Sequence, residues 1–168
     1  MTDDAPVQSK PDMIAFSPIG FVRSPNTDTS ATPIQPVYAK GIRGRIEILD
    51  QYTEALEDLD GFSYIHVLYY FHRAGPAVLK VKPFLDDVAR GTFATRSPRR
   101  PNAIGLSIVR LVGREDSVLL VEDVDMLDGT PVLDIKPYVP RFDLREQVRA
   151  GWQDAVDEQT AKRRGRRE

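Results

Sequence analysis

The chain has 168 residues, of which 41% are hydrophobic and 29% charged, and its formal net charge is -2. This composition is typical of one soluble globular domain with its own core, and it excludes a disordered or uniformly basic protein. The absence of cysteine excludes disulfides and thiolate metal sites. No segment reaches the length of about 18 apolar residues that a membrane-spanning helix needs.

Residues 1–12 carry Asp3 and Asp4 where a signal peptide would need a cationic start and an apolar run, so we expect a disordered tail and a cytoplasmic protein. Short segments rich in β-branched and aromatic residues follow, separated by Gly, Pro or Asp. They predict strands at residues 14–22, 45–49, 62–71, 79–84, 92–95, 104–112, 118–124 and 132–138. The intervals are too short for repeated βαβ units. The pattern therefore predicts a mainly β fold, a single compact barrel of about eight strands that is not a Rossmann fold.

Two segments have helical periodicity, a short one at residues 51–59 and a longer C-terminal one at residues 143–163. Residues 24–36 are rich in Pro, Ser, Thr and Asp, which predicts a long exposed loop. We expect the barrel domain to span residues 13–152. Residues 153–168 are then the end of the helix and a disordered basic tail, which is either solvated or in contact with nucleic acid phosphates.

Several common catalytic patterns are absent, namely the dinucleotide fingerprint, the phosphate-binding Walker loop and the nucleophile elbow. His66 and His72 lie on one expected strand, about 20 Å apart at about 3.3 Å per residue, so they cannot share a metal ion. No metal site is expected. The alternate positions Ile65, Val67, Tyr69 and Phe71 are predicted to face the core.

Residues 94–102, ATRSPRRPN, form the densest local signal. Pro98 and Pro101 prevent a helix or a central strand, so this segment is a stiff loop that displays guanidinium groups. Such a loop suits a carboxylate or phosphate, but a solvated basic turn is equally compatible. A second group, Asp125, Asp128 and Asp134, surrounds an Asp-Gly turn. This group is interpreted either as a hairpin with solvated acids or as carboxylates that accept hydrogen bonds from ribose hydroxyls or amino groups.

Five blocks of the sequence carry a resemblance to a known family. They are residues 19–25 (IGFVRSP), Gln35, residues 59–73 (LDGFSYIHVLYYFHR), residues 94–107 and residues 125–140. Together they resemble the TrmO, or TsaA-like, family of tRNA methyltransferases. The resemblance implies a compact β-barrel that binds S-adenosylmethionine and acts as a homodimer. It also implies methylation of N6 of threonylcarbamoyl-adenosine at position 37 of a tRNA.

The resemblance also assigns residues by position. Cofactor contacts fall on Gln35, His72, Arg73, Arg96, Leu106, Asp125, Met126, Leu127 and Asp128. Arg96 suits the methionyl carboxylate, and Asp125 or Asp128 suits the ribose hydroxyls or the ammonium group. Side chains that could orient the N6 amine are Asn102, Asp134 and Tyr138. Groups that could meet tRNA phosphates are Arg99, Arg100 and Lys136. Tyr64 and Tyr70 are expected in a dimer interface.

Departures from the family pattern leave alternatives open. Ala103 replaces the proline that usually follows the asparagine. Some bacterial members carry an additional C-terminal domain, which leaves the exact RNA substrate open. A module that binds S-adenosylmethionine without methyl transfer, a methyltransferase with another substrate, and a hydrolase using Ser97 or Asp128 are the alternatives.

Overall fold

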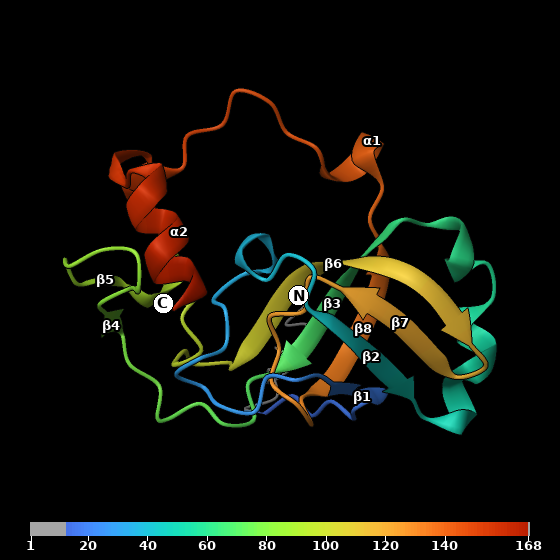
Figure 1. Cartoon of the computed structure of the whole chain (residues 1–168). Coiled ribbons are helices and arrows are strands. Elements are labelled where there is room, and N and C mark those ends of the chain that lie inside the picture. The colour runs from blue at the N-terminus through green and yellow to red at the C-terminus, as the bar shows by residue number, and fades with distance from the viewer. Residues whose placement is uncertain (1–12, 168) are drawn as a thin grey trace, which may run out of the picture.

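The structure, a computed structural model, describes residues 13–167. Its main body is a closed barrel of six antiparallel strands in the order β1-β2-β7-β6-β3-β8, with β8 paired to β1 (Figure 1). The barrel strands are β1 (Gly20–Arg23), β2 (Arg43–Ile48), β3 (Tyr64–Tyr70), β6 (Ile104–Glu115), β7 (Val118–Glu122) and β8 (Pro131–Pro137). Two further strands, β4 (Lys80–Val81) and β5 (Arg90–Gly91), form a separate small sheet. The expected mainly β barrel is confirmed.

The barrel core follows from the alternation of apolar residues along the strands. In β6, Gly105, Ser107, Val109 and Leu111 are buried, and the residues between them face outward. In β3, Ile65, Val67 and Tyr69 are buried, as predicted. Phe71, just beyond β3, packs partly buried against the same core. The remaining buried apolar core residues are Val22, Ile46, Ile48, Leu56, Leu119, Val121, Val124, Met126 and Val132.

Two of the expected strands differ in the structure. Residues 92–95 form a 3-10 turn, η4 (Thr92–Ala94), and residues 79–84 contribute only the two residues of β4. The hydroxyl of Thr92 donates to the carbonyl of Val78, and that of Thr95 donates to the carbonyl of Thr92. Threonine is β-branched and favours strands, but here its hydroxyl groups stabilise a local turn instead.

The helical predictions are confirmed only in part. Residues 51–59 become two 3-10 segments, η2 (Asp50–Leu56) and η3 (Leu59–Gly61). A third 3-10 segment, η1 (Pro36–Tyr38), ends the loop of residues 24–36. The predicted helix at residues 143–163 is wrong. That region contains the end of α1 (Pro140–Asp143), an exposed arch of residues 144–150, η5 (Gly151–Ala155) and α2 (Glu158–Arg166).

The single helix predicted at residues 143–163 does not form, for two physical reasons. Gly151 has a φ of +65°, outside the helical region. Asp157 caps a new helix by accepting a hydrogen bond from the backbone N–H of Thr160 at 2.8 Å. Because α2 continues to Arg166, the prediction of a disordered basic tail is wrong over the described residues. The tail expected at residues 1–12 lies outside the part of the chain that the structure describes.

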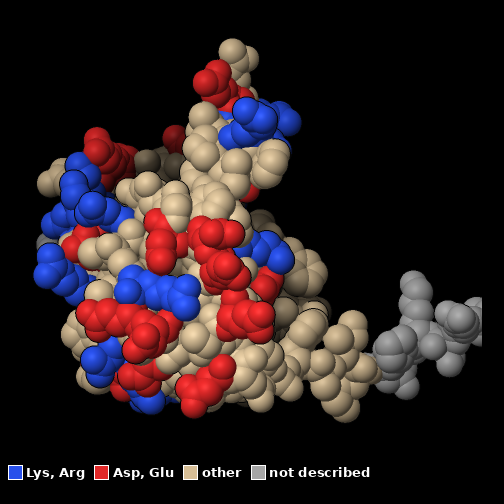
Figure 2. Space-filling model, turned by 90° about the vertical axis from the view of Figure 1, so that its right-hand side faces the viewer, with Lys and Arg blue, Asp and Glu red and all other residues tan. Residues whose placement is uncertain are grey.

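The small sheet and α2 lie together at one end of the barrel (Figure 1). In Figure 1, β4, β5 and α2 lie together at the left of the barrel, and the arch of residues 144–150 passes above it. The side of the molecule at the right of Figure 1 carries interspersed acidic and basic side chains (Figure 2). Within residues 13–167, no helix is long and apolar enough to cross a membrane, and no cluster of three or more potential ligands is arranged to hold a metal ion.

Candidate functional site

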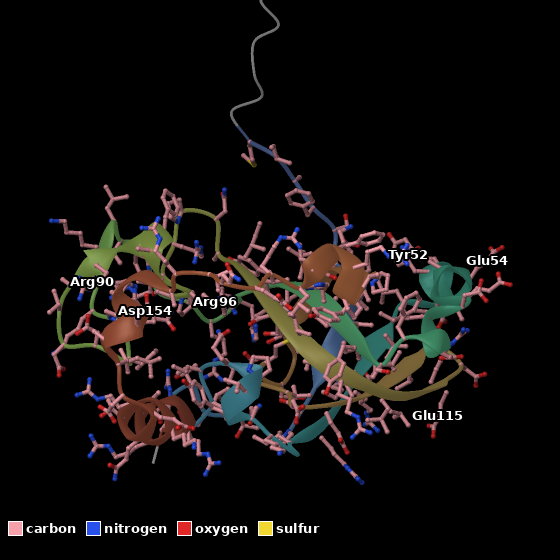
Figure 3. The ribbon with its side chains drawn as sticks, turned by 90° about the horizontal axis from the view of Figure 1, so that it is seen from above. Tyr52, Glu54, Arg90, Arg96, Glu115 and Asp154 are labelled. Atoms are coloured by element: carbon pink, nitrogen blue, oxygen red, sulfur yellow. The ribbon has the colours of Figure 1, made fainter. Side chains whose placement is uncertain are left out.

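A cavity of about 350 Å³ lies at the end of the barrel where β3 finishes. Four parts of the chain form its walls: the barrel end, the loop of residues 24–36, residues 71–99, and residues 151–167, which we term the C-terminal segment. Figure 3 shows Arg96 between the barrel and the C-terminal segment, with Tyr52, Glu54 and Glu115 at the opposite end of the barrel. Concave sites of this size are typical of small-molecule binding.

A chain of buried polar groups lies at the barrel side of the cavity. The Ser107 hydroxyl donates to Oδ1 of Asp125 at 2.7 Å, and the Tyr69 hydroxyl lies 3.2 Å from the same Ser107 oxygen. Asp125 is 8% exposed and Ser107 is 1% exposed. The Tyr69 ring lies directly over Gly105, where a Cβ would be 2.3 Å from the ring. Glycine is therefore required at this position to seat the ring.

Burial dominates the electrostatics of this group. Removal from water raises the pKa of Asp125 to about 7, while the Ser107 hydrogen bond and the nearby Arg96 charge act in the opposite direction. Burial also raises the pKa of Tyr69, so this phenol stays neutral. Both the protonated and the ionised form of Asp125 are consequently accessible near neutral pH. A cation or a hydroxyl donor entering the cavity would favour its charged form.

Arg96 lies between this cavity and a second one of about 400 Å³. Its guanidinium donates to Oε1 of Gln35, which fixes the side chain in place. The two cavities share Gln35, Tyr69, Phe71, Thr95 and Arg96 in their walls. The second cavity adds Phe93, Arg100, Pro101, Asn102, Ile104, Gly105 and Leu106. The two cavities are therefore neighbouring compartments of one site.

The loop of residues 94–102 is held by its own arginines. Arg100 donates to the carbonyl of Thr95 at 3.1 Å, and Nε of Arg99 donates to the carbonyl of Pro76 at 3.1 Å. After β3, Arg73 donates to the carbonyl of Thr27 at 2.9 Å. The pKa of the neighbouring His72 is lowered, first by burial and then by the Arg73 charge, so this imidazole is neutral at pH 7.

Residues 125–128 are held in place by side chains from the loop of residues 24–36. The Asn26 amide donates to the carbonyls of Val124 and Met126, and the Ser24 hydroxyl donates to that of Met126. Asp128 is exposed and accepts from the backbone N–H of Ser24 at 3.2 Å. The turn is therefore present, but the hairpin reading is wrong, because β7 pairs with β2 and β6 while β8 pairs with β1 and β3.

The structure thus brings together most of the residues that the sequence indicated. Gln35, His72, Arg73, Arg96, Arg99, Asp125, Met126 and Leu127 line the first cavity. Gln35, Arg96, Arg100, Asn102 and Leu106 line the second. Asp128, Asp134, Lys136 and Tyr138 line neither.

Three of these residues, which lie in β8 or just after it, are kept away from both cavities by their own contacts. Asp134 faces the outside of the barrel opposite Leu68, and the Lys136 ammonium binds its carboxylate at 2.7 Å. The Tyr138 ring packs beside His66, with ring centroids 5.6 Å apart, and its N–H donates to the carbonyl of Tyr64. Phe71, which lines both cavities, follows Tyr64 by seven residues, which places Tyr138 about 23 Å from Phe71 at about 3.3 Å per residue.

Sequence reasoning missed Ser107, Trp152 and Arg167 as site residues. Ser107 had a detectable signal, since it is a polar residue on the inward side of an alternating apolar strand. Trp152 and Arg167 line the first cavity from the C-terminal segment, and Trp152 donates from Nε1 to the carbonyl of Ala94 at 2.8 Å. Only the tertiary structure brings that segment to the cavity.

Taken together, the two compartments suit one kind of ligand. Arg96 can bind a carboxylate, Asp125 can accept from an ammonium group or hydroxyls, and Phe71, Met126 and Leu106 provide apolar surface for a flat ring. A small zwitterion joined to a nucleoside has all three parts. The sequence motifs that suggested such a site therefore converge in space.

Comparison with known proteins agrees with this arrangement. The family model described as "tRNA-methyltransferase O N-terminal domain" matches residues 21–144. A probable S-adenosyl-L-methionine-binding protein of Pyrococcus abyssi is 51% identical over 84% of this chain and 77% of its own length. The human tRNA (adenine(37)-N6)-methyltransferase is 38% identical over 78% of this chain and 31% of its own.

A solved structure, "Crystal structure of TrmO", superposes with a TM-score of 0.72 at 45% identity, covering 83% of this chain and 64% of that one. The chain thus spans less than two thirds of that protein and about a third of the human enzyme. The matched residues nevertheless include the whole barrel from β2 to β8 and the loop of residues 94–102. This chain belongs to the tRNA-methyltransferase O N-terminal domain family.

Proposed function

We propose that this chain is an S-adenosylmethionine-dependent methyltransferase that modifies N6 of threonylcarbamoyl-adenosine at position 37 of tRNA in the cytoplasm. The observation that carries the proposal is that a buried carboxylate, Asp125, and a guanidinium held by Gln35, Arg96, line the same cavity in a chain of this family. Relatives named as S-adenosylmethionine-binding proteins and as tRNA (adenine(37)-N6)-methyltransferases support it.

The donor set of the cavity fits S-adenosylmethionine. Arg96, steadied by Gln35, would hold its carboxylate, and Asp125, steadied by Ser107, would accept from its ammonium group or ribose hydroxyls. His72 is neutral and can share in hydrogen bonding without repelling the sulfonium charge. Met126, Leu127 and Leu106 would contact the adenine ring. When bound, this cofactor supplies an electrophilic methyl group.

The work of the protein in such a reaction would be to orient the N6 amine and to accept a hydrogen bond from it. The proton that N6 loses on methylation would pass to water. An acceptor beside N6 would raise the electron density on this weakly nucleophilic nitrogen. Asn102 is best placed among the three proposed residues, because it lines the second cavity beside Arg96. Asp134 and Tyr138 would need a partner subunit to approach a reacting group.

A homodimer could provide that approach, and one face of the barrel suits it. Outward residues of β3 and β6 form a largely apolar surface, since Tyr70 pairs with Ile104 and Leu68 with Leu106, while His66, beside Ile108, is its polar member and binds Asp143. Ile104 and Leu106 also line the second cavity. Faces of this kind are typical of protein interfaces. A second copy on this face would close the second compartment.

The RNA would be bound by charge at the same end of the molecule. Arg99 is exposed on the loop of residues 94–102, and Arg100 lies beside it at the second cavity. Both are held through backbone carbonyls rather than by acidic side chains, so their charges remain available to phosphates. Lys136 is different, because its ammonium group already binds Asp134.

The experiment is transfer of a labelled methyl group from S-adenosylmethionine to tRNA, with mass analysis of the nucleosides. One tRNA sample contains threonylcarbamoyl-adenosine and the other lacks the modification. We expect one added methyl only on the threonylcarbamoyl-adenosine. Methyl transfer to another nucleoside would contradict the substrate, and cofactor binding without any transfer would favour the binding-module alternative.

Arg96→Ala provides the matched test of the site. It should weaken cofactor binding by about 2 to 5 kcal/mol, as expected when one partner of a desolvated charge pair is removed. Arg45→Ala removes an exposed arginine of β2 that is paired with Glu47 and lines neither cavity, so it should leave binding unchanged. Equal affinities of the two variants in calorimetry would exclude the proposed role of Arg96.

A further inference from the structure

The C-terminal segment is tied by three contacts to two other walls of the first cavity. Ile34 N–H donates to the carbonyl of Gly165 at 3.1 Å, which joins α2 to the loop of residues 24–36. Arg164 binds Asp87 at 2.9 Å, which joins α2 to the region around β4 and β5. Trp152 binds the Ala94 carbonyl. These contacts hold the end of α2 beside the cavity, although the family match ends at residue 144.

Close packing fixes the position of α2. Gly165 is buried against Tyr38, and a Cβ at this position would lie 2.4 Å from the Tyr38 ring. This contact sets the direction in which the chain leaves the helix. Arg167 then adopts a left-handed conformation with a φ of 62° and directs its side chain to the cavity wall.

Arg167 is held there without a carboxylate partner among residues 13–167. Its guanidinium lies 4.0 Å from the centroid of the Phe84 ring and donates from Nη1 to the carbonyl of Thr29. Its buried Nε has no hydrogen-bond partner in the described part of the chain. Burial lowers its pKa, so the protein places this charge in a site where it is poorly solvated.

The charge balance of the cavity indicates what such an arginine could bind. Five cationic residues line the cavity, Arg73, Lys82, Arg96, Arg99 and Arg167, against one carboxylate, that of Asp125. Lys82 is paired with Asp87, but no ion pair forms at the four arginines within residues 13–167; the Asp28 carboxylate, which does not line the cavity, acts on Arg73 and Arg167 only through longer-range electrostatics. S-adenosylmethionine carries only one carboxylate, together with an ammonium and a sulfonium group. The excess positive charge therefore matches a second, anionic ligand.

We propose that Arg167 is a substrate-binding residue, which receives the anionic oxygen group of the RNA nucleotide that enters the cavity. This rests on the proposed function above. The group is either the carboxylate of the threonylcarbamoyl substituent or a phosphate of the anticodon loop, since both match the guanidinium. Arg96 lies on the loop of residues 94–102, close enough to Asp125 to act on its charge, whereas Arg167 lies on the C-terminal segment. The two arginines would thus divide cofactor and substrate between them.

The test measures binding without catalysis. Full-length protein saturated with S-adenosylhomocysteine is titrated into two labelled anticodon stem-loop RNAs, one with threonylcarbamoyl-adenosine and one with adenosine. Arg167→Gln should weaken binding at least about tenfold, as for the loss of a charge-assisted contact. An effect confined to the modified RNA identifies the carboxylate. An equal effect on both RNAs, with a salt slope reduced by about one, identifies a phosphate.

Matched variants separate this role from a merely structural one. Arg163→Ala removes an exposed arginine from the same helix and should change neither RNA affinity nor cofactor affinity. Arg167→Lys keeps the charge and should recover part of the affinity. Gly165→Ala keeps Arg167 but forces α2 away from Tyr38, so it should weaken RNA binding as Arg167→Gln does.

The outcomes also separate this inference from the proposed function. If the wild-type protein bound neither RNA, the proposed function would fail and the inference with it. If wild type bound the RNA and Arg167→Gln bound it equally well, only the role of Arg167 would be overturned. A loss of cofactor affinity in Arg167→Gln equal to its loss of RNA affinity would also overturn it, because a substrate contact leaves the cofactor unaffected.

Discussion

The Ser107 hydroxyl donates a 2.7 Å hydrogen bond to Oδ1 of Asp125, and both side chains are buried at the barrel end of the cavity. Ser107 lies on β6, and Asp125 follows β7, so the bond fixes the Asp125 carboxylate to the barrel wall. Burial raises the pKa of Asp125 while this bond lowers it. Stability and ligand binding should therefore both depend on this pair.

Asp125 should make the protein less stable as the pH rises. Its folded pKa is about 7, against an ordinary value of 3.8. The folded protein therefore holds a proton that the unfolded chain releases, and the free energy of unfolding falls as the pH rises from about 4 to about 7, by up to about 4 kcal/mol. Asp125→Asn should flatten this dependence in thermal unfolding scans. Asp134→Asn changes a carboxylate on the outside of the barrel and should keep the wild-type dependence of stability on pH. If Asp125→Asn lost stability with rising pH as steeply as wild type, the pH dependence would not come from Asp125.

Ser107→Ala should move the pH dependence of cofactor binding. Without the hydrogen bond the pKa of Asp125 rises further, so the acidic limb of the affinity profile moves to higher pH. We expect affinity at pH 7 to fall by about 1.5 to 3 kcal/mol, the usual contribution of a hydrogen bond to a charged group. Calorimetry between pH 6 and about 8.5 measures this. Tyr69→Phe keeps the Ser107–Asp125 bond and serves as the control; its affinity profile should move along the pH axis by less than that of Ser107→Ala. Identical pH profiles for Ser107→Ala and wild type would remove Ser107 from this role.

Gly105→Ala should destabilise the protein through one contact. The new methyl group would meet the Tyr69 ring at 2.3 Å, and Tyr69 is buried, so the ring must move. Overpacking of this kind costs about 1 to 3 kcal/mol. Chemical denaturation measures the loss. Gly91→Ala, where the added Cβ meets nothing within 4 Å, should stay within about 0.5 kcal/mol of wild type, and equal effects of the two substitutions would show that the Tyr69 contact does not matter.

Ile108→Glu should disrupt the proposed homodimer. Ile108 is 39% exposed at the centre of the outward β3–β6 face and lines neither cavity. A carboxylate placed there would be desolvated on association, so the dimer should dissociate at micromolar concentration. Light scattering after size-exclusion chromatography measures the mass. Leu79→Glu, at a residue 78% exposed and away from β3 and β6, should behave as wild type. A dimer that persists in Ile108→Glu would place the interface elsewhere.

Much of the fold could be predicted because its strands encode their own geometry. The alternation of Ile65, Val67 and Tyr69 predicts both a strand and the side that faces the core, since side chains alternate across a strand. The prediction failed where local hydrogen bonding outweighed residue preference. Thr92 and Thr95 form a turn, and the cap at Asp157 begins a new helix in a region whose periodicity is typical of one long helix.

The sequence by itself determined the family, the barrel class and the set of chemical groups in the site, because these depend on residue types and their order along the chain. Only the tertiary structure decided which groups meet. Asp125 is buried beside Ser107, whereas Asp134 faces outward on β8, although the sequence presents both as acids near one turn. Closure of the barrel and the docking of α2 at Gly165 depend on long-range packing. No short-range pattern encodes such contacts, so Arg167 becomes a cavity residue only in the folded chain.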